Sequence, residues 1–92
     1  MKMEISEIRL TPIKPRQSLV AFASCVVDRQ FYFGGIAIHC DLLNKSFRCV
    51  FPTKQVAGKE LPIYHPITKE AGEAIQRAII IEWENLIKRA YF

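Results

Sequence analysis

Residues 19–40 read LVAFASCVVDRQFYFGGIAIHC, and this stretch decides the fold class. It contains two apolar runs, at residues 19–28 and 31–40, which a short polar turn separates. Runs rich in β-branched and aromatic residues on either side of such a turn are typical of a β-hairpin. Gly34 and Gly35 interrupt the second run, and paired glycines in a strand indicate a bulge or a sharp coil. The sequence therefore predicts an antiparallel hairpin.

Further strands are expected on both sides of this hairpin. Residues 3–13 alternate between apolar and polar, but the alternation changes phase at residues 6–7, which predicts a bulge in that strand. A short strand is expected at 46–51. Residues 61–64 are apolar enough for one more strand, which Pro62 confines to an edge because proline has no N–H to donate.

The last quarter of the chain carries the pattern of an amphipathic helix. Thr68 is a good N-cap, and apolar residues follow at helical spacing, so we predict a helix at 69–89. The complete expectation is a single α+β domain over residues 1–92, a twisted antiparallel sheet of four to five strands followed by one long C-terminal helix. The apolar side of this helix is wider than one sheet needs, which favours burial against a second copy of the chain.

Composition limits the classes of function. The chain has 92 residues and a net charge of +4, from 13 lysines and arginines against 9 acidic residues, which favours polyanionic partners. It contains no run of about 18 apolar residues, and charges occupy the part of the N-terminus where a signal peptide would be apolar. We therefore expect a cytoplasmic protein that has no membrane partner.

Three cysteines, Cys25, Cys40 and Cys49, each lie in an apolar run. Because their number is odd and their surroundings are strand-like, we interpret them as reduced thiols rather than as a disulfide framework.

Catalysis is not expected from the residue inventory. The two histidines are His39 and His65, but no serine or cysteine lies in a nucleophile motif and no glycine-rich phosphate loop opens a helix. His65 precedes the helix start, where an imidazole can bind backbone groups of the loop. His39 and Cys40 are metal-ligand types, but adjacent strand residues point to opposite faces. We expect no enzyme, cofactor, metal site or small-molecule substrate.

Basic residues give a more specific indication of function. Lys54 and Lys59 lie in a long loop between residues 51 and 67, and Lys69 begins the helix. The N-terminus of a helix offers free N–H groups and the positive end of the dipole, so these lysines and the helix start together can bind phosphates. The alternative is that the lysines only solvate a loop.

The order of the motifs resembles the SpoVG family, the stage V sporulation and septation proteins of bacteria. Four segments carry the resemblance: EISEIRL near the start, AFASCVVDRQFYFGGIAI across the hairpin, FRCVFPTK at the last main strand, and IYHPI before the helix. The resemblance covers about residues 3–88.

The resemblance implies a small homodimeric regulator that binds DNA, RNA or both, linked to sporulation and septation. By position, it implies contacts from the loop after the last main strand and from the helix, which gives Lys54, Lys69 and Arg77 as nucleic-acid-binding residues. The chain departs from the family at three places. Glu60-Leu61-Pro62 stands where the family has a stretch rich in acidic and basic residues. Gln55 stands where the family has arginine, and Ala37 stands where the family has a basic residue.

A second class of function stays open. A protein-interaction module could bind another protein through the apolar side of the helix or through a free sheet edge, without binding nucleic acid. Heparin retention that depends on salt would separate the two hypotheses.

Overall fold

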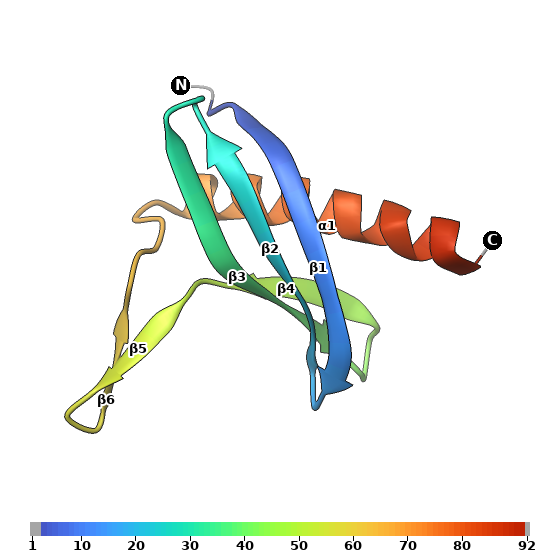
Figure 1. Cartoon of the computed structure of the whole chain (residues 1–92), viewed down its shortest axis with the longest axis horizontal. Helices are drawn as coiled ribbons and strands as arrows, with labels where there is room; N and C mark the ends of the chain where they lie inside the picture. The colour runs from blue at the N-terminus through green and yellow to red at the C-terminus, as the bar shows by residue number, and fades with distance from the viewer. Residues whose placement is uncertain (1–2, 92) are drawn as a thin grey trace.

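A computed structural model describes residues 3–91, with the backbone alone at residues 90 and 91. It confirms the α+β class: one four-stranded antiparallel sheet in the order β1-β2-β3-β4, a small two-stranded sheet, and one C-terminal helix (Figure 1). The elements are β1 (Ile5–Arg16), β2 (Leu19–Val27), β3 (Phe31–Asp41), β4 (Ser46–Val50), β5 (Thr53–Val56), β6 (Lys59–Pro62) and α1 (Lys69–Tyr91).

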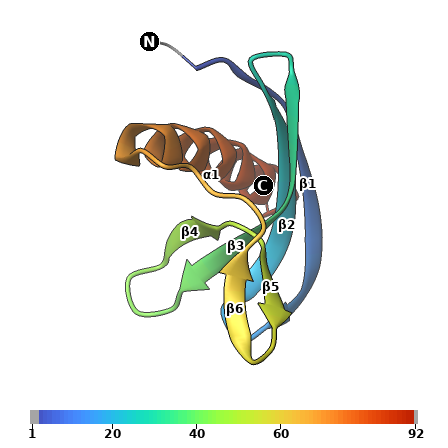
Figure 2. The same cartoon turned by 90° about the vertical axis from the view of Figure 1, so that its left-hand side faces the viewer.

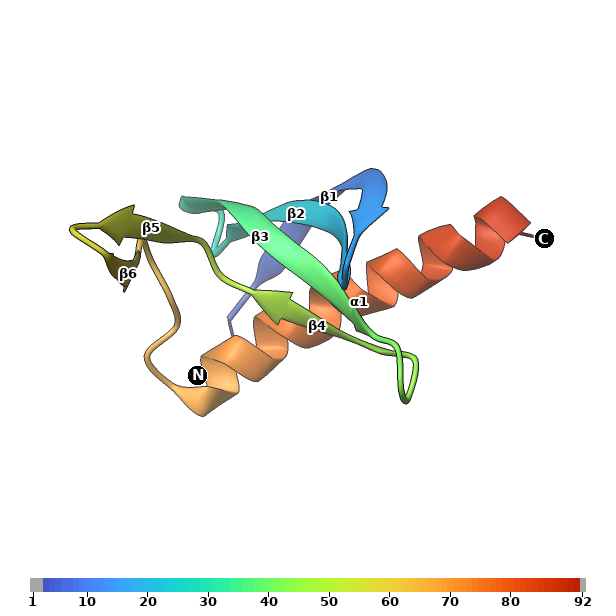
Figure 3. The same cartoon turned by 90° about the horizontal axis from the view of Figure 1, so that it is seen from below.

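The four-stranded sheet and α1 form two layers, and α1 lies against one face of the sheet (Figure 3). Alternate residues of β2 are buried toward the helix, and the helix contributes a stripe at helical spacing. The buried apolar residues are Ala21, Ala23, Cys25, Val27, Ile36, Ile38, Ile75, Ile79 and Trp83. This single core lies between the central hairpin and the middle of the helix.

Two irregularities predicted from the sequence are present in the sheet. The pairing of β1 with β2 shifts between Ser6 and Arg9, and Glu7 has a left-handed backbone with φ 48°. The pairing of β2 with β3 shifts opposite the two glycines, where Gly35 has φ 70°. Each bulge changes which residues face the helix and so keeps the apolar side chains inside.

Strand β1 is longer than the predicted 3–13, because it continues to Arg16. Pro15 lies in this extension, and Pro12 lies just before it. Since β1 is an outer strand of its sheet, one side of its backbone needs no partner, and prolines are tolerated there.

Residues 53–62 correct the prediction of an open loop with an edge strand at 61–64. They form a separate hairpin, the arm, in which β6 pairs with β5 and not with the main sheet. The two residues between the strands, Ala57 and Gly58, both have positive φ, at 51° and 77°. That is the geometry of a type I′ turn, which joins tightly paired strands. All the residues of β5 and β6 are exposed, and the arm projects from the body (Figure 1).

The segment between the arm and the helix is held at Tyr64. Its hydroxyl donates a hydrogen bond to the Gly34 carbonyl oxygen at 2.7 Å, and its ring stacks on Phe33 with 4.9 Å between centroids. Thr68 then caps the helix as predicted, since its Oγ1 accepts from the Ala71 N–H at 3.1 Å.

The broad apolar side of α1 is mostly absorbed by its own sheet. Ile80, Leu86 and Ile87 pack against the core beside the buried Trp83, and among the large apolar side chains described for α1, Ile81 stays half exposed, at 51%. The width of the helix side is therefore weaker support for a dimer than the sequence pattern suggested.

Candidate nucleic-acid interface

The arm places two of the predicted lysines on one face. Lys54 pairs with Leu61, and Lys59 pairs with Val56. Because paired residues share a face and so do residues two apart, Lys54 and Lys59 lie diagonally on the same side of the arm. Gln55 and Glu60 pair with each other on the opposite side. The acidic residue of the arm is thus kept away from the lysine face.

The helix start lies at the same end of the molecule as the arm, as Figures 1 and 3 both show. Lys69 is exposed there, at the first position of α1. Glu70 in the first turn and Glu73 in the next are exposed as well, and their charges offset part of the attraction of this end for phosphate.

Arg77 is exposed two turns further along α1, with Glu73 one turn before it. The two residues line the same shallow surface hollow with Gln76 and Ile80. Of the four predicted residues, the structure therefore brings Lys54 and Lys59 onto one surface, sets Lys69 at the same end of the molecule, and leaves Arg77 apart.

One salt bridge is present among the side chains that the structure describes. It joins Arg29 to Glu4, with 3.2 Å between Nε and Oε2. It lies at the tip of the central hairpin, away from the arm. No carboxylate in the described part of the chain is paired with Lys54, Lys59 or Lys69, so their charges are open to a ligand.

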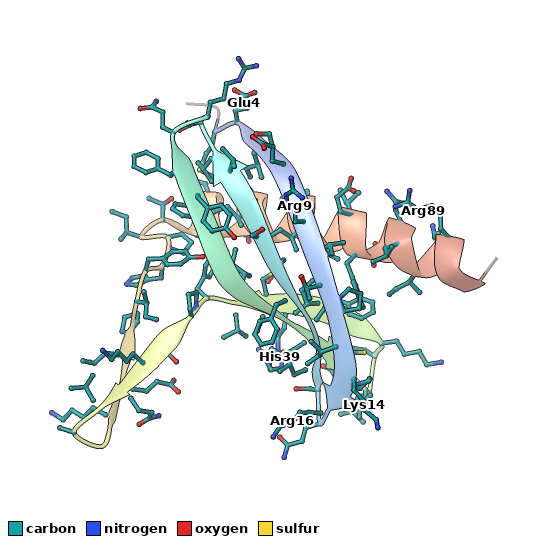
Figure 4. All side chains as sticks on the ribbon, viewed as in Figure 1. Glu4, Arg9, Lys14, Arg16, His39 and Arg89 are labelled. Carbon is teal, nitrogen blue, oxygen red and sulfur yellow. The ribbon has the colours of Figure 1, made fainter. Side chains whose placement is uncertain are left out.

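A second set of basic residues lies outside the site that the sequence predicted. Arg9, Lys14 and Arg16 are exposed along β1, and Arg9 lies over β1 on the side of the sheet opposite the helix (Figure 4). Arg48 is exposed on β4 beside His39 of β3. The alternation along the strands could have predicted this placement. Arg9 and Arg48 each stand between two residues that face the core, so both arginines point to the opposite face of the sheet.

The two histidines bind within the chain. His39 Nδ1 lies 2.7 Å from Ser18 Oγ, and burial together with the nearby Arg48 charge lowers the pKa of His39. His65 Nδ1 lies 3.0 Å from the Pro66 carbonyl oxygen, in agreement with the predicted loop contact.

All three cysteines are free thiols. Burial raises the pKa of Cys25, and burial followed by the influence of Cys25 raises the pKa of Cys49 to about 12. A thiol that stays protonated is a poor nucleophile and a poor metal ligand. No group of three metal-ligating side chains occurs among the described residues. In the described part of the chain, no helix is long and apolar enough to cross a membrane.

Comparison with known proteins connects this arrangement to a family. The SpoVG family model matches residues 3–85. A protein of Shouchella clausii is 31% identical over 85 residues, which cover 91% of this chain and 85% of the relative. A protein of Clostridium perfringens is 30% identical, with 91% and 92% covered, and one of Treponema denticola is 29% identical, with 90% and 88% covered. All three relatives bear the name "Putative septation protein SpoVG". The match runs from β1 through most of α1, and the chain belongs to the SpoVG family.

Proposed function

We propose that the protein is a dimeric regulator of septation that binds nucleic acid through the lysines of the arm and the start of α1. The observation that carries the proposal is the shared face of Lys54 and Lys59 on a hairpin whose strands are exposed throughout. A narrow arm with two unpaired cations can follow a phosphate backbone more closely than a flat sheet can. The net charge of +4 favours the same class of ligand.

Phosphate contacts predict a steep dependence on salt. Each phosphate neutralised on duplex DNA contributes about 0.9 to the slope of log affinity against log salt concentration. Fluorescence anisotropy with labelled duplex DNA, single-stranded DNA and RNA, each over a salt series, measures this slope and identifies the preferred ligand. Reversal of both arm lysines, Lys54→Glu with Lys59→Glu, should remove about 1.8 from the duplex slope and lower affinity at least roughly tenfold.

A matched control makes the same change of net charge elsewhere. Lys45, in the turn before β4, and Lys88, near the end of α1, are both exposed. The double variant Lys45→Glu, Lys88→Glu should keep more of the salt slope than the arm variant. If the two double variants lose the same part of the salt slope, binding depends only on the net charge of the protein. The arm would then not be the nucleic-acid interface.

A second copy of the chain is part of the proposal. Apolar side chains stay exposed around the base of the arm and the helix start: Phe31 at 57%, Ile63 at 60% and Ile67 at 91%. Large apolar side chains that stay exposed can be covered by a second copy of the chain, and a two-fold dimer would present the arm lysines twice. Light scattering after size exclusion should give twice the 10.6 kDa chain mass, and Ile63→Asp with Ile67→Asp should give the monomer.

The protein-interaction alternative has one observation of its own. A groove of about 500 Å³ lies between α1 and the main sheet, with apolar lining that includes Pro12 of β1, Val20 of β2, Phe47 of β4 and Leu86 of α1. Such a groove can receive an apolar segment of another protein. Under this alternative, the reversed arm lysines leave function in cells unchanged, and no nucleic acid binds at low salt.

A further inference from the structure

The face of the main sheet that is turned away from α1, here called the open face, is covered by no element among residues 3–91 (Figure 2). The strand registers define its members, because partners across strands share a face. In β2, Phe22, Ser24 and Val26 alternate with residues that are buried against the helix. Their open-face neighbours are Thr11, Arg9 and Ser6 of β1 and Ala37 and Tyr32 of β3, and Arg48 of β4 lies beside His39.

Two aromatic rings are exposed on this face. Tyr32 is 71% exposed and Phe22 is 39% exposed. Small residues lie around them: Ala37 is the cross-strand partner of Phe22, and Ser24 separates Phe22 from Val26, the partner of Tyr32. The rings therefore stand above a low surface, where a flat ligand can reach them.

The absence of a side chain at Gly34 leaves room for the Tyr32 ring. A Cβ at Gly34 would lie 2.8 Å from Tyr32 Cε2 and 3.0 Å from its hydroxyl oxygen, so the ring occupies space that any other side chain would take. One edge of the ring thus rests against the strand, while most of the ring is open to solvent. An ordered, exposed ring loses little further freedom when a partner stacks on it.

The spacing of the rings fits an extended strand of nucleotides. Phe22 and Val26 are four residues apart, which is roughly 13 Å along a strand, and Tyr32 is the cross-strand partner of Val26, so the Cα atoms of Phe22 and Tyr32 are about 14 Å apart. The Tyr32 ring extends over Gly34, and the two rings are therefore closer together than the two Cα atoms. Two neighbouring bases that stay stacked, about 3.4 Å apart, cannot lie one on Tyr32 and the other on Phe22. The two bases that reach these rings must be unstacked, or the bases between them must be skipped. Unstacked bases of single strands can do so.

Charge on the open face favours a polyanion. Arg9 borders Ser24, between the two rings, and Arg48 lies near the other end of the face. The acidic residues near it are Glu7, at the bulge of β1, and Asp41, whose Oδ1 accepts a hydrogen bond from the Leu43 N–H at 2.9 Å. Arginine can bind a phosphate or stack on a base, and both modes suit this position.

We propose that the open face binds single-stranded nucleic acid, with bases stacked on Tyr32 and Phe22 and phosphates bound by Arg9 and Arg48. The inference rests on the proposed function for its class of ligand, and it adds a surface separate from the arm. The arm contacts backbone phosphate of any nucleic acid, whereas the open face needs base faces that a duplex keeps inside its stack. The result is a preference for single strands that the arm alone cannot supply.

The test compares one labelled 12-nucleotide single strand, as DNA and as RNA, with the matching duplex. Tyr32→Ala should lower affinity for the single strands at least about fivefold and leave the duplex unchanged, because stacking on one aromatic side chain contributes about 1–3 kcal/mol per base. Phe22→Ala should act in the same direction. Leu42→Ala with Leu43→Ala is the matched control, since these exposed apolar residues lie in the β3–β4 turn.

Two further variants keep the test independent of folding. Gly34→Ala leaves both rings in the chain but displaces Tyr32 from its place, and it should lose single-strand affinity while circular dichroism stays unchanged. Arg9→Gln should lower the single-strand salt slope by about 0.7, the contribution of one phosphate.

The outcomes separate this inference from the proposed function. If all nucleic-acid binding depends on Lys54 and Lys59 and the Tyr32→Ala protein retains single-strand affinity, the proposed function stands and the open-face inference is overturned. If no nucleic acid binds the wild type at low salt, both fail. If Tyr32→Ala instead converts a dimer to a monomer without changing single-strand affinity, a second copy covers the open face and the inference is overturned.

Discussion

The Oε1 atom of Gln76 accepts a hydrogen bond from the backbone N–H of Cys49 at 2.9 Å. Gln76 lies on α1, and Cys49 lies on β4, the outer strand of the sheet, so the bond joins the helix to an otherwise unpaired edge. A glutamine on a helix next to Arg77 resembles a base-reading side chain, but this one is half-buried and is engaged within the protein. Its role is to stabilise the edge of β4.

Gln76→Ala should therefore destabilise the domain without changing nucleic-acid contacts. The Cys49 N–H would lose its acceptor in a half-buried position, at a cost of about 1–2 kcal/mol in the free energy of unfolding. Chemical denaturation measures this loss, and Gln76→Glu, which keeps an acceptor oxygen, should lose less. A Gln76→Ala protein as stable as the wild type but weaker in DNA binding would assign the residue to the interface instead.

Trp83 is buried, and its Nε1 has no hydrogen-bond partner among the residues that the structure describes. Its ring packs edge-on against Phe47 with 6.0 Å between centroids. Trp83→Phe removes the unpartnered N–H and keeps most of the apolar contact, so it should cost far less than Trp83→Ala, for which we expect about 3–5 kcal/mol. Urea denaturation of both variants gives the comparison. Equal costs would contradict this expectation.

Tyr64 should titrate late. Burial, followed by smaller effects of Cys25 and Tyr32, raises the pKa of Tyr64 from 10.0 to about 12. Between these values the unfolded chain releases a proton that the folded chain keeps, so the contribution of Tyr64 to stability is full below pH 10 and is lost as pH rises toward 12. Tyrosinate absorbance should show one late step, which Tyr64→Phe removes. A wild-type titration without a late step would contradict the partial burial that raises this pKa.

The turn of the arm can be improved. Ala57 has φ 51°, a left-handed conformation that alanine adopts at a cost and asparagine tolerates better. Ala57→Asn should stabilise the arm by on the order of 0.5 kcal/mol. Because the arm pairs only with itself, amide exchange at Val56 and Lys59 is a better measurement than the melting temperature. If the arm is the interface, nucleic-acid affinity should rise with its order, and Gln17→Asn, at another left-handed position, is the control that should leave affinity unchanged.

Local pattern was sufficient where one strand or helix determines its own form. The phase change at residues 6–7 predicted the bulge at Glu7, Thr68 predicted the helix start, and the two apolar runs predicted the central hairpin. These features depend on neighbours within a few positions of the chain. The predictions that failed concerned pairing between segments, which alternation alone does not specify.

The arm shows what only the tertiary structure decided. The sequence contains its lysines, its Ala57-Gly58 turn and its apolar strand residues, but it does not say that β6 pairs with β5 rather than with the main sheet. That choice places Lys54 and Lys59 on one face of a hairpin that stands apart from the main sheet.

By itself, the sequence determined the α+β class, the family, the basic charge and the capped helix, because periodicity, composition and capping are local properties. The tertiary structure decided which basic residues share a surface, which aromatic rings face solvent, and that Gln76 serves the sheet edge. These depend on the register between strands and on the packing of the helix, where contacts between residues distant in the chain compete for the same apolar area.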